Sequence, residues 1–465
     1  MASLTGLPVD VLREIILHTI HDPIDPQKFN KYCLLPLAST CRRLREVSIE
    51  FLFWSVDVFE ASFGLQHRVL KSAVAFERFN EVLDTQTGYI RSGVRRLLVR
   101  DRDKTASGHL WTILAKLENL RSLHLDGPFH RPGTTISFPF PPAPEGLFER
   151  EDVMERLVNV TLLGVLFGSP IYPFLLRRGS FTNLTRIDYL EDIIDPSSSS
   201  PPHPFSSFAS DTEPVFPYLR TFILTFASQS PESIDHTLHF LALHHKTLER
   251  LGVRERAGGE FYRPQWPPPD EQGLPKPWIP CYHRLWNRLG RLSSLKLLAL
   301  SATVIQPDCV PTSRIILPNL RALHLHGHFY RGFMATGRIT QYDIKELNQM
   351  APLLKMLPSP HIACGDYYDG QRSWKSPMIY QYSHWVYEGD HDHESALIRM
   401  WLESSQFAGM KTFTRLGGRL MASFSFLWSE KGLVVSYIQT EDERRRLLDT
   451  VGHWSLAEDA DLETR

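Results

Sequence analysis

The chain has few cysteines and no excess of either charge. Its five cysteines among 465 residues form no Cys-x-x-Cys pair and are odd in number. Reduced thiols in a cytoplasmic or nuclear protein are therefore the simplest interpretation. Lysine and arginine number 51 against 52 aspartates and glutamates, and the pI is about 7.1. No overall basic field exists to attract nucleic acid or an acidic membrane, so neither is expected as a partner.

Long apolar runs are also missing. No stretch approaches the length needed to span a bilayer, so we expect no transmembrane helix. The N-terminus has no basic region ahead of an apolar run, and Asp10, Arg13 and Glu14 interrupt the apolar residues that are there. We therefore expect no secretory signal peptide.

Motifs for catalysis are absent as well. The sequence contains no Gly-x-x-x-x-Gly-Lys-Ser/Thr loop, no Gly-x-Gly-x-x-Gly turn after a strand and no Gly-x-Ser-x-Gly elbow. Two clusters hold metal-ligand residue types: His324, His326 and His328 alternate along one segment, and Asp390 to Glu394 form the other. The histidines have no acidic third ligand and no nearby cysteine at a recognisable spacing. The second cluster is expected in a loop, without the helix that makes His-Glu-x-x-His a metal site. A solvated surface is therefore favoured over a zinc site for both. We expect no metal, no cofactor and no enzyme activity, with a metal-dependent enzyme as the remaining alternative.

The pattern of the first fifty residues predicts a small helical module. Pro8 suits the first helical position and Asp10 the first turn, and apolar residues follow at helical spacing. A second helix is predicted from near Pro36, and a third apolar run extends from Ile49 to Trp54. Three short helices cannot bury this much apolar surface away from water, so part of that surface should contact a partner. The alternative is that the surplus packs on the domain that follows.

The stretch contains, in order, Leu7-Pro8, Asp10, Leu12, Ile15-Ile16, Leu34-Leu35, Leu37-Ala38, Cys41-Arg42-Arg43-Leu44 and Phe53-Trp54. Through this ordered set it resembles the F-box of substrate receptors in Skp–cullin–F-box ubiquitin ligases. Leu44 stands where that family commonly has tryptophan, and the insert from 21 to 32 is longer than usual. The resemblance implies that an adaptor of the Skp type, and through it a cullin, binds this module. The residues implied to contact the adaptor are Leu7, Pro8, Leu12, Ile15, Ile16, Leu35, Leu37 and Leu44.

From about residue 60 a short template recurs, apolar-x-x-apolar-x-apolar. Successive copies begin as little as 25 residues apart (Leu295 to Leu320) and as much as 47 (Leu248 to Leu295). The shorter steps fit a leucine-rich repeat, and the longer ones contain Pro-rich insertions expected to form loops. The eight copies are Val94-Leu97-Val99, Leu120-Leu123-Leu125, Leu157-Val160-Leu162, Leu184-Ile187-Tyr189, Leu219-Phe222-Leu224, Leu248-Leu251-Val253, Leu295-Leu298-Leu300 and Leu320-Leu323-Leu325.

The last two apolar residues of each copy lie two apart and should point to one face of a strand. Stacked copies then predict an α/β fold with a parallel sheet on the concave side of an irregular solenoid. The family template places asparagine or cysteine three residues beyond the last apolar position. This chain has other residues there, so no asparagine ladder is expected. Chance recurrence of apolar triplets in an ordinary α/β protein is the alternative.

Past about Pro358 the repeat fades. A helix is predicted from Glu394 to Glu403, and a hairpin from Phe424 to Tyr437 around a Gly-containing turn. Another helix is predicted from Glu441 to Asp449. The predicted domains are the helical module at 1–58, the solenoid at 59–358 and a C-terminal cap at 359–465, with a separate small domain as the alternative for the last part.

Polar residues beside the inward-facing positions should line the concave face. Their mixed charge favours recognition of a protein substrate over nucleic acid. The candidates for substrate binding are Arg100, His124, Asp126, Asp188, Arg250, Arg254, His324 and His326. The chain is thus expected to be a non-catalytic substrate receptor of a ubiquitin ligase in the cytoplasm or nucleus. A leucine-rich-repeat scaffold without a ligase role is the alternative.

Overall fold

The computed structural model divides the chain into two compact units. Residues 1–204, 215–219 and 456–465 form unit 1, and residues 205–214 and 220–455 form unit 2. The domain boundaries at 58 and 358 stay a prediction. The structure describes residues 6–20, 34–53, 55–58, 72–85, 88–100, 107–126, 157–158, 160–166, 181–190, 204–226, 231–255, 279–301, 307–326, 341–367, 391–405, 409–418, 420–430 and 432–438.

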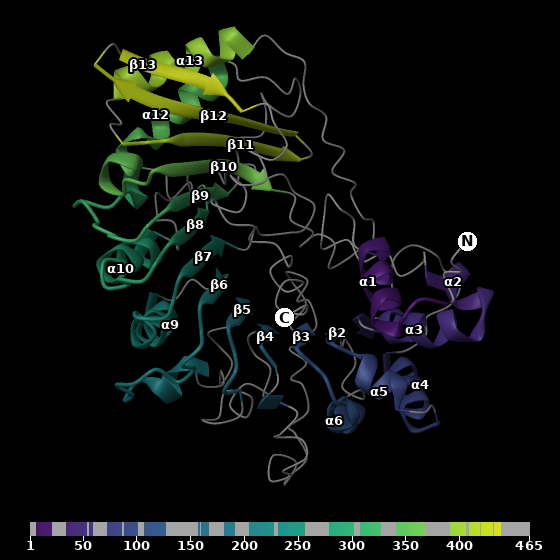
Figure 1. Cartoon of the computed structure of the whole chain (residues 1–465). Coiled ribbons are helices and arrows are strands. Elements are labelled where there is room, and N and C mark those ends of the chain that lie inside the picture. The colour runs from purple at the N-terminus through teal and green to yellow at the C-terminus, as the bar shows by residue number, and fades with distance from the viewer. Residues whose placement is uncertain are drawn as a thin grey trace, which may run out of the picture. The chain divides into compact units, whose positions relative to one another are not determined.

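Unit 1 begins with helices and continues as a parallel sheet (Figure 1). Its helices are α1 (Val9–Ile20), α2 (Leu34–Thr40), α3 (Arg42–Leu52), α4 (Ser72–Thr85), α5 (Tyr89–Gly93) and α6 (Ser107–Lys116). Its strands are β1 (Ser55–Val58), β2 (Arg96–Arg100), β3 (Ser122–Asp126), β4 (Leu162–Leu166) and β5 (Arg186–Leu190). The strands pair in chain order, each parallel to the next.

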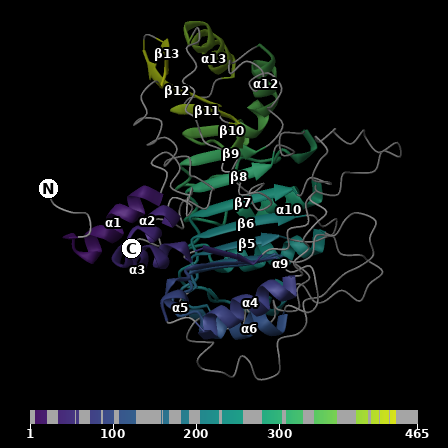
Figure 2. The same ribbon diagram turned by 90° about the vertical axis from the view of Figure 1, so that its right-hand side faces the viewer.

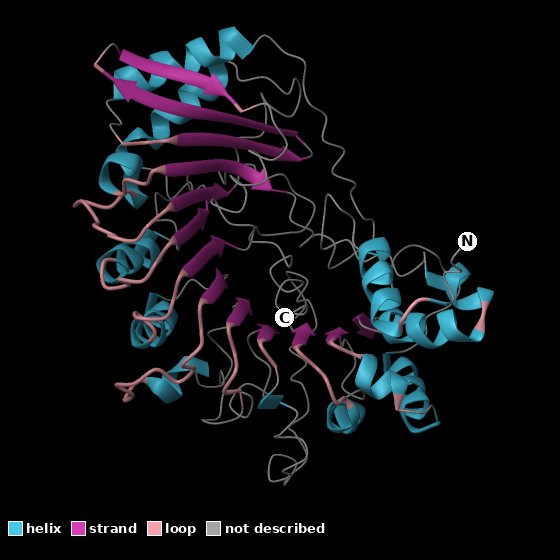
Figure 3. Ribbon diagram, viewed as in Figure 1, coloured by secondary structure: helices cyan, strands magenta, loops and turns pink. Residues whose placement is uncertain are grey.

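Unit 2 is a larger sheet, and its helices alternate along the chain with its strands from β6 to β11 (Figures 2 and 3). Strands β6 to β11 pair in parallel and in chain order, and β11, β12 and β13 pair antiparallel. The strands are β6 (Thr221–Phe226), β7 (Arg250–Glu255), β8 (Leu297–Ser301), β9 (Ala322–His326), β10 (His361–Tyr367), β11 (Thr412–Gly418), β12 (Leu420–Ser429) and β13 (Gly432–Tyr437). The helices are η4 (Pro204–Phe208), α9 (Pro231–Leu243), α10 (Ile279–Leu289), η6 (Pro307–Cys309), α12 (Gln341–Met356) and α13 (His391–Ser405).

The predicted α/β class with a mostly parallel sheet is confirmed. Equivalent template residues lie side by side: Leu97 pairs with Leu123, and Leu298 pairs with Leu323. All four side chains are fully buried. The apolar spacing of the template thus places one face of these strands in the core, as period-2 alternation requires.

The prediction for the third copy is wrong by three residues. Leu123 pairs with Leu163 and Leu125 with Val165, so the aligned copy is Val160-Leu163-Val165 rather than Leu157-Val160-Leu162. Both choices satisfy the same apolar spacing, because Leu157 occupies another buried position three residues before the template. Spacing alone could not choose between them, and strand pairing does.

The structure also contains a side-chain ladder that the sequence analysis did not expect. The residue just before the first apolar position of one copy donates a hydrogen bond to a backbone carbonyl of the preceding copy. Asn119 Nδ2 donates to the Ser92 carbonyl (2.8 Å), Asn319 Nδ2 to that of Ser293 (2.7 Å), and Ser294 Oγ to that of Lys246 (2.8 Å). The family template has its asparagine after the strand, whereas Asn119 and Asn319 precede strands β3 and β9.

Parallel pairing continues beyond the predicted end of the repeat. Ile362 of β10 pairs with Leu323 of β9, and Phe413 of β11 pairs with Ile362. The predicted hairpin is confirmed, with Phe426 opposite Val435, and Gly432 adopts a φ of 114° that disfavours other residues. The helix predicted at 441–449 lies outside the described residues.

The helix predicted from Glu394 to Glu403 is present as the longer α13, and two other predictions are corrected. The helix expected from Pro36 breaks at Cys41, which is extended (φ −156°, ψ 163°) and precedes α3. The loop expected around His391 is instead the first turn of α13, where Asp392 and Glu394 suit the positive end of the helix. Among the described residues, no helix has the length and apolar content required to cross a membrane.

Candidate partner-binding surfaces

The start of α1 is fixed by its proline. Pro8 has no amide hydrogen to leave unpaired, and its carbonyl accepts the Leu12 amide at 3.0 Å, which closes the first turn. Asp10 in that turn pairs with Arg13 at 3.2 Å on the surface. Arg43 of α3 reaches back and donates from Nη2 to the Leu7 carbonyl at 2.6 Å. The entry to α1 is therefore held by the third helix of the same module.

Helices α1, α2 and α3 share one small core. Its buried members are Leu12, Ile16, Leu34, Leu44, Val47 and Phe51, and Leu7 and Leu37 pack partly buried against them. Five of the eight residues predicted to contact an adaptor thus lie in or against the module's own core. Leu12, Ile16 and Leu44 are at most 5% exposed, so in this structure they hold the module together.

The other three predicted contact residues face solvent. Pro8 is exposed, Ile15 is 38% exposed and Leu35 is 54% exposed. Val11 is 42% exposed and was missed by the sequence analysis. The spacing of Pro8, Val11 and Ile15 is i, i+3, i+7, so they share one face of α1. We call Pro8, Val11, Ile15 and Leu35 the exposed apolar set.

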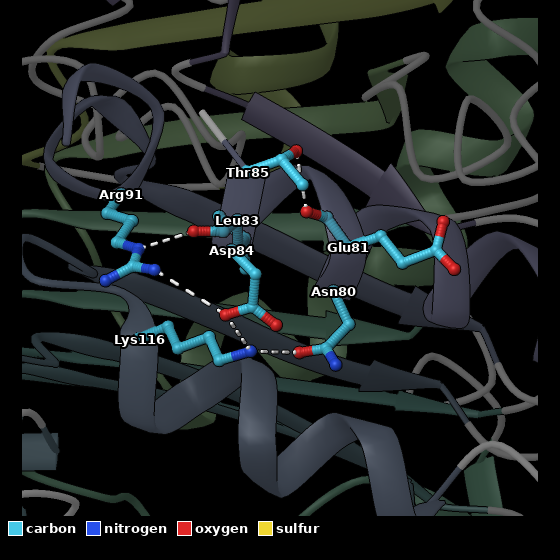
Figure 4. Close-up of polar contacts among 7 residues, drawn as sticks. All are labelled: Asn80, Glu81, Leu83, Asp84, Thr85, Arg91 and Lys116. Atoms are coloured by element: carbon cyan, nitrogen blue, oxygen red, sulfur yellow. Dashed lines mark hydrogen bonds and ion pairs between the residues drawn. The ribbon is translucent and has the colours of Figure 1, made fainter. Parts of the chain in front are cut away.

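A polar cluster joins the helices that follow this module (Figure 4). Lys116 Nζ of α6 lies 2.6 Å from Asp84 Oδ1 and 2.8 Å from Asn80 Oδ1, both on α4. Arg91 of α5 donates from Nε to the Leu83 carbonyl at 2.5 Å and lies 3.5 Å from Asp84. These contacts tie α4, α5 and α6 together, and α5 packs against α3. The cluster therefore has a structural role in joining these helices.

Pairing brings several of the predicted substrate-binding positions together. Arg100 and Asp126 are register partners on β2 and β3, and the row of His124 continues through Gly164 to Asp188. In unit 2, Thr225 is the partner of Arg254, and Arg250 is in register with Leu297. The side chains of Arg100, His124, Asp126, Arg254 and His326 lie outside the described set, so their role stays a prediction.

Asp188 is already engaged within its own strand. Arg186 donates from Nε to Oδ1 (2.8 Å) and from Nη2 to Oδ2 (2.9 Å), a bidentate pair. The two side chains are 5% and 13% exposed. Two residues apart on a strand share one face, so the Arg-x-Asp spacing could have indicated this pair. The carboxylate charge of Asp188 is therefore largely compensated inside the protein.

His324 was expected on an open sheet face, and that expectation is wrong. Its side chain is only 4% exposed, and its register partners Ala299 and Ala363 are fully buried. Nearby, Nδ1 of His361 lies 2.8 Å from Oγ1 of Thr412. Burial, and secondarily the charge of Lys411, lowers the pKa of His361 and favours its neutral form.

The remaining metal-ligand residue types do not assemble into a site among the described residues. In that part of the chain, no group of three or more histidine, cysteine, aspartate or glutamate side chains is arranged to hold a metal ion. In the first turn of α13, Glu394 is buried and His393 is exposed. The two histidine clusters therefore supply no metal centre from the described part of the chain.

Comparison with known proteins leaves the chain without a family assignment. No protein-family model matches it, and no curated protein matches it. The functional inference therefore rests on the N-terminal residues, on the exposed apolar set and on the parallel sheet.

Proposed function

We propose that this protein is the substrate-recognition subunit of a Skp–cullin–F-box ubiquitin ligase. The helical module binds the Skp-type adaptor, and the sheet-bearing remainder, an irregular leucine-rich-repeat solenoid, binds a protein substrate. The observation that carries the proposal is that apolar side chains remain exposed on α1 and α2 although the module has a complete core of its own.

The burial pattern separates residues that stabilise the module from residues that can contact a partner. Leu12, Ile16 and Leu44 form its core, whereas the exposed apolar set lies at the surface, where a partner could cover it. Exposed apolar side chains that gather on one helix face are typical of protein interfaces. The resemblance to F-box sequences identifies that partner as the adaptor.

The repeated strands support the second half of the proposal. Their stacked parallel register and the buried template residues are typical of leucine-rich repeats, and the hydrogen bonds of Asn119, Ser294 and Asn319 tie successive copies together. Such arrays bind proteins over extended surfaces. The receptor performs no bond chemistry: it holds substrate lysines near a ubiquitin-charged enzyme and raises their effective concentration.

A binding experiment with purified adaptor tests this proposal. The variant Ile15→Asp/Leu35→Asp places two carboxylates in the proposed interface, and we expect the affinity for the adaptor to fall at least about tenfold, or 1.4 kcal/mol. Because both side chains are exposed, the free energy of unfolding should change by less than about 1 kcal/mol. Isothermal titration calorimetry and thermal melting measure the two quantities.

The matched control is Met400→Asp/Leu427→Asp, which makes the same change at two exposed apolar residues of unit 2 that are 59% and 66% exposed. It should bind the adaptor as the unmodified chain does. Undiminished adaptor binding by the Ile15/Leu35 variant, or no binding by the unmodified chain, would count against a ligase role.

The alternative function is an interaction scaffold of the same architecture that has no ligase role. It would keep the partner of the sheet and bind no adaptor. Affinity purification of the full chain followed by mass spectrometry separates the two, since a receptor brings down adaptor and cullin together with its client.

A further inference from the structure

The residues immediately before strands β6 to β11 form a column along one edge of the unit 2 sheet. We call these residues the strand-start column. Its backbone is tied from strand to strand: the amides of Glu249, Lys296 and Arg321 donate to the carbonyls of Arg220, Glu249 and Lys296 at 2.7–2.8 Å. In chain order the column consists of Arg220, Glu249, Lys296, Arg321, Pro360 and Lys411.

Most of the charge in this column is positive and uncompensated. Arg220, Arg321 and Lys411 are exposed. Their side chains make no hydrogen bond or ion pair with any residue that the structure describes. Lys296 is different, because its Nζ lies 2.7 Å from Glu249 Oε1, so these two charges cancel. The positive charge of Lys411 is felt on the next strand, where it helps to lower the pKa of His361. Three cations therefore face solvent along one edge of a chain whose net charge is −1.

Additional positive charge lies beside the column. Lys246 is exposed, and its carbonyl accepts a hydrogen bond from Ser294, two residues before Lys296. Arg291 is exposed in the same turn region. Charge segregation of this kind in a nearly neutral protein marks a surface suited to an anionic partner.

We propose that the strand-start column of unit 2 binds an acidic segment of a partner protein, rich in aspartate and glutamate. Neighbouring strands are about 4.8 Å apart, so Arg220 and Arg321, three strands apart, are about 14 Å from each other. Arg321 and Lys411, two strands apart, are about 10 Å from each other. An extended peptide advances about 3.3 Å per residue, so carboxylates three or four residues apart match these cations.

The same column disfavours nucleic acid. Glu249 interrupts the cations between Arg220 and Lys296 and would face a continuous line of phosphates, whereas a peptide can place an uncharged residue opposite it. Domains that bind nucleic acid usually have a strongly basic pI, and this chain has a pI of about 7.1. Two arginines in the column also suit carboxylates, which they can bind in a bidentate manner.

This proposal extends the proposed function, because the acidic segment bound by the column would belong to the substrate. The identification of that segment as substrate rests on the proposed receptor role. The binding itself does not depend on the adaptor. Loss of adaptor binding through the exposed apolar set and loss of peptide binding through this column are therefore separate results.

Fluorescence anisotropy with the full chain tests the proposal. The probe is a fluorescein-labelled decapeptide of alternating acidic and alanine residues, and the reference probe replaces each acid by its amide. We expect Arg220→Glu/Arg321→Glu to weaken binding of the acidic probe at least about tenfold, and the neutral variant Arg220→Gln/Arg321→Gln to weaken it about threefold. Binding of the unmodified chain should weaken with added salt, since exposed charges are screened.

The control variant is Lys345→Glu/Arg399→Glu, which makes the same charge change on exposed positions of α12 and α13. It should stay within about twofold of the unmodified chain, and thermal melting should show all variants folded. Equal loss in this control, equal binding of the amide probe, or tighter binding of a single-stranded RNA decamer than of the acidic peptide would each overturn the proposal.

Discussion

The helical module α1–α3 and the strand-start column of unit 2 expose opposite chemistry. The module leaves apolar side chains such as Ile15 and Leu35 in solvent, whereas the column leaves cations such as Arg220 and Arg321 there. The reason is the size of the core that each region can build. Three short helices enclose six buried apolar residues and have no room for more.

The repeat has the opposite property. Each new strand adds its template residues to a core that continues from its neighbours, so apolar residues of the template are absorbed. What remains outside in unit 2 includes the residue just after the first template position, and this residue is charged in Arg220, Glu249, Lys296 and Arg321. A small core thus produces an apolar surface, and a repeating core produces a polar one, which suits two different partners.

The largest expected effect concerns the two cores. Leu12→Ala in the module and Leu298→Ala in unit 2 each remove a fully buried side chain and should cost about 2–5 kcal/mol of unfolding free energy. Hydrogen exchange should show α3 losing protection in the first variant and β7 and β9 in the second. Ile15→Ala and Leu427→Ala, both at exposed sites, should change stability by less than about 0.5 kcal/mol. Equal losses at buried and exposed sites would remove the distinction between core and surface.

The next effect depends on pH and belongs to unit 2. His244 is fully buried, its Nδ1 lies 2.9 Å from the Phe240 carbonyl, and burial lowers its pKa to about 4. The unfolded chain binds the proton with a pKa near 6.5, so unfolding takes up a proton between the two values. Stability is therefore complete above about pH 6.5 and should fall by roughly 2–3 kcal/mol as the pH drops to 4.

Urea unfolding of the unmodified chain and of His244→Phe between pH 7 and pH 4.5 measures this difference. The variant loses the Phe240 hydrogen bond and should be less stable at pH 7, yet its stability should vary less with pH. Parallel pH curves for the two proteins would contradict the assignment.

The smallest effect concerns the ladder that unites the repeat. Asn319→Ala removes the bond from Nδ2 to the Ser293 carbonyl and should cost about 1 kcal/mol. Asn348→Ala changes an exposed asparagine within α12 and should be neutral or slightly stabilising, because alanine favours helix. Chemical denaturation compares the two variants, and a larger loss for Asn348→Ala would exclude a role for the ladder in stability.

Particular residues show how far sequence reasoning reached. The template in seven of eight copies identified the strand and its inward side chains, because period-2 alternation is a local property of the chain. It failed at Leu157, where a second apolar residue three positions away satisfied the same spacing. The helix predicted from Glu394 begins three residues earlier, at His391, and it packs through Leu397 and Trp401, both buried.

The candidate surfaces divide in the same way. Apolar spacing identified α1 and its face pattern, but it could not separate Leu12, which is buried, from Ile15, which is exposed. That distinction depends on which side of α1 meets α3. Likewise, Asp188 and His324 looked alike as polar residues on a sheet face, and only packing shows that one is paired with Arg186 and the other is enclosed.

The sequence by itself determined the α/β class, the parallel order of the strands and the presence of an amphipathic N-terminal helix, because each follows from the local spacing of apolar residues. Only the tertiary structure decided the register of the third copy, the ladder of Asn119 and Asn319, the burial of His324 and the alignment of Arg220 with Arg321. These features arise between residues tens of positions apart, where the free energy depends on which strands and helices become neighbours.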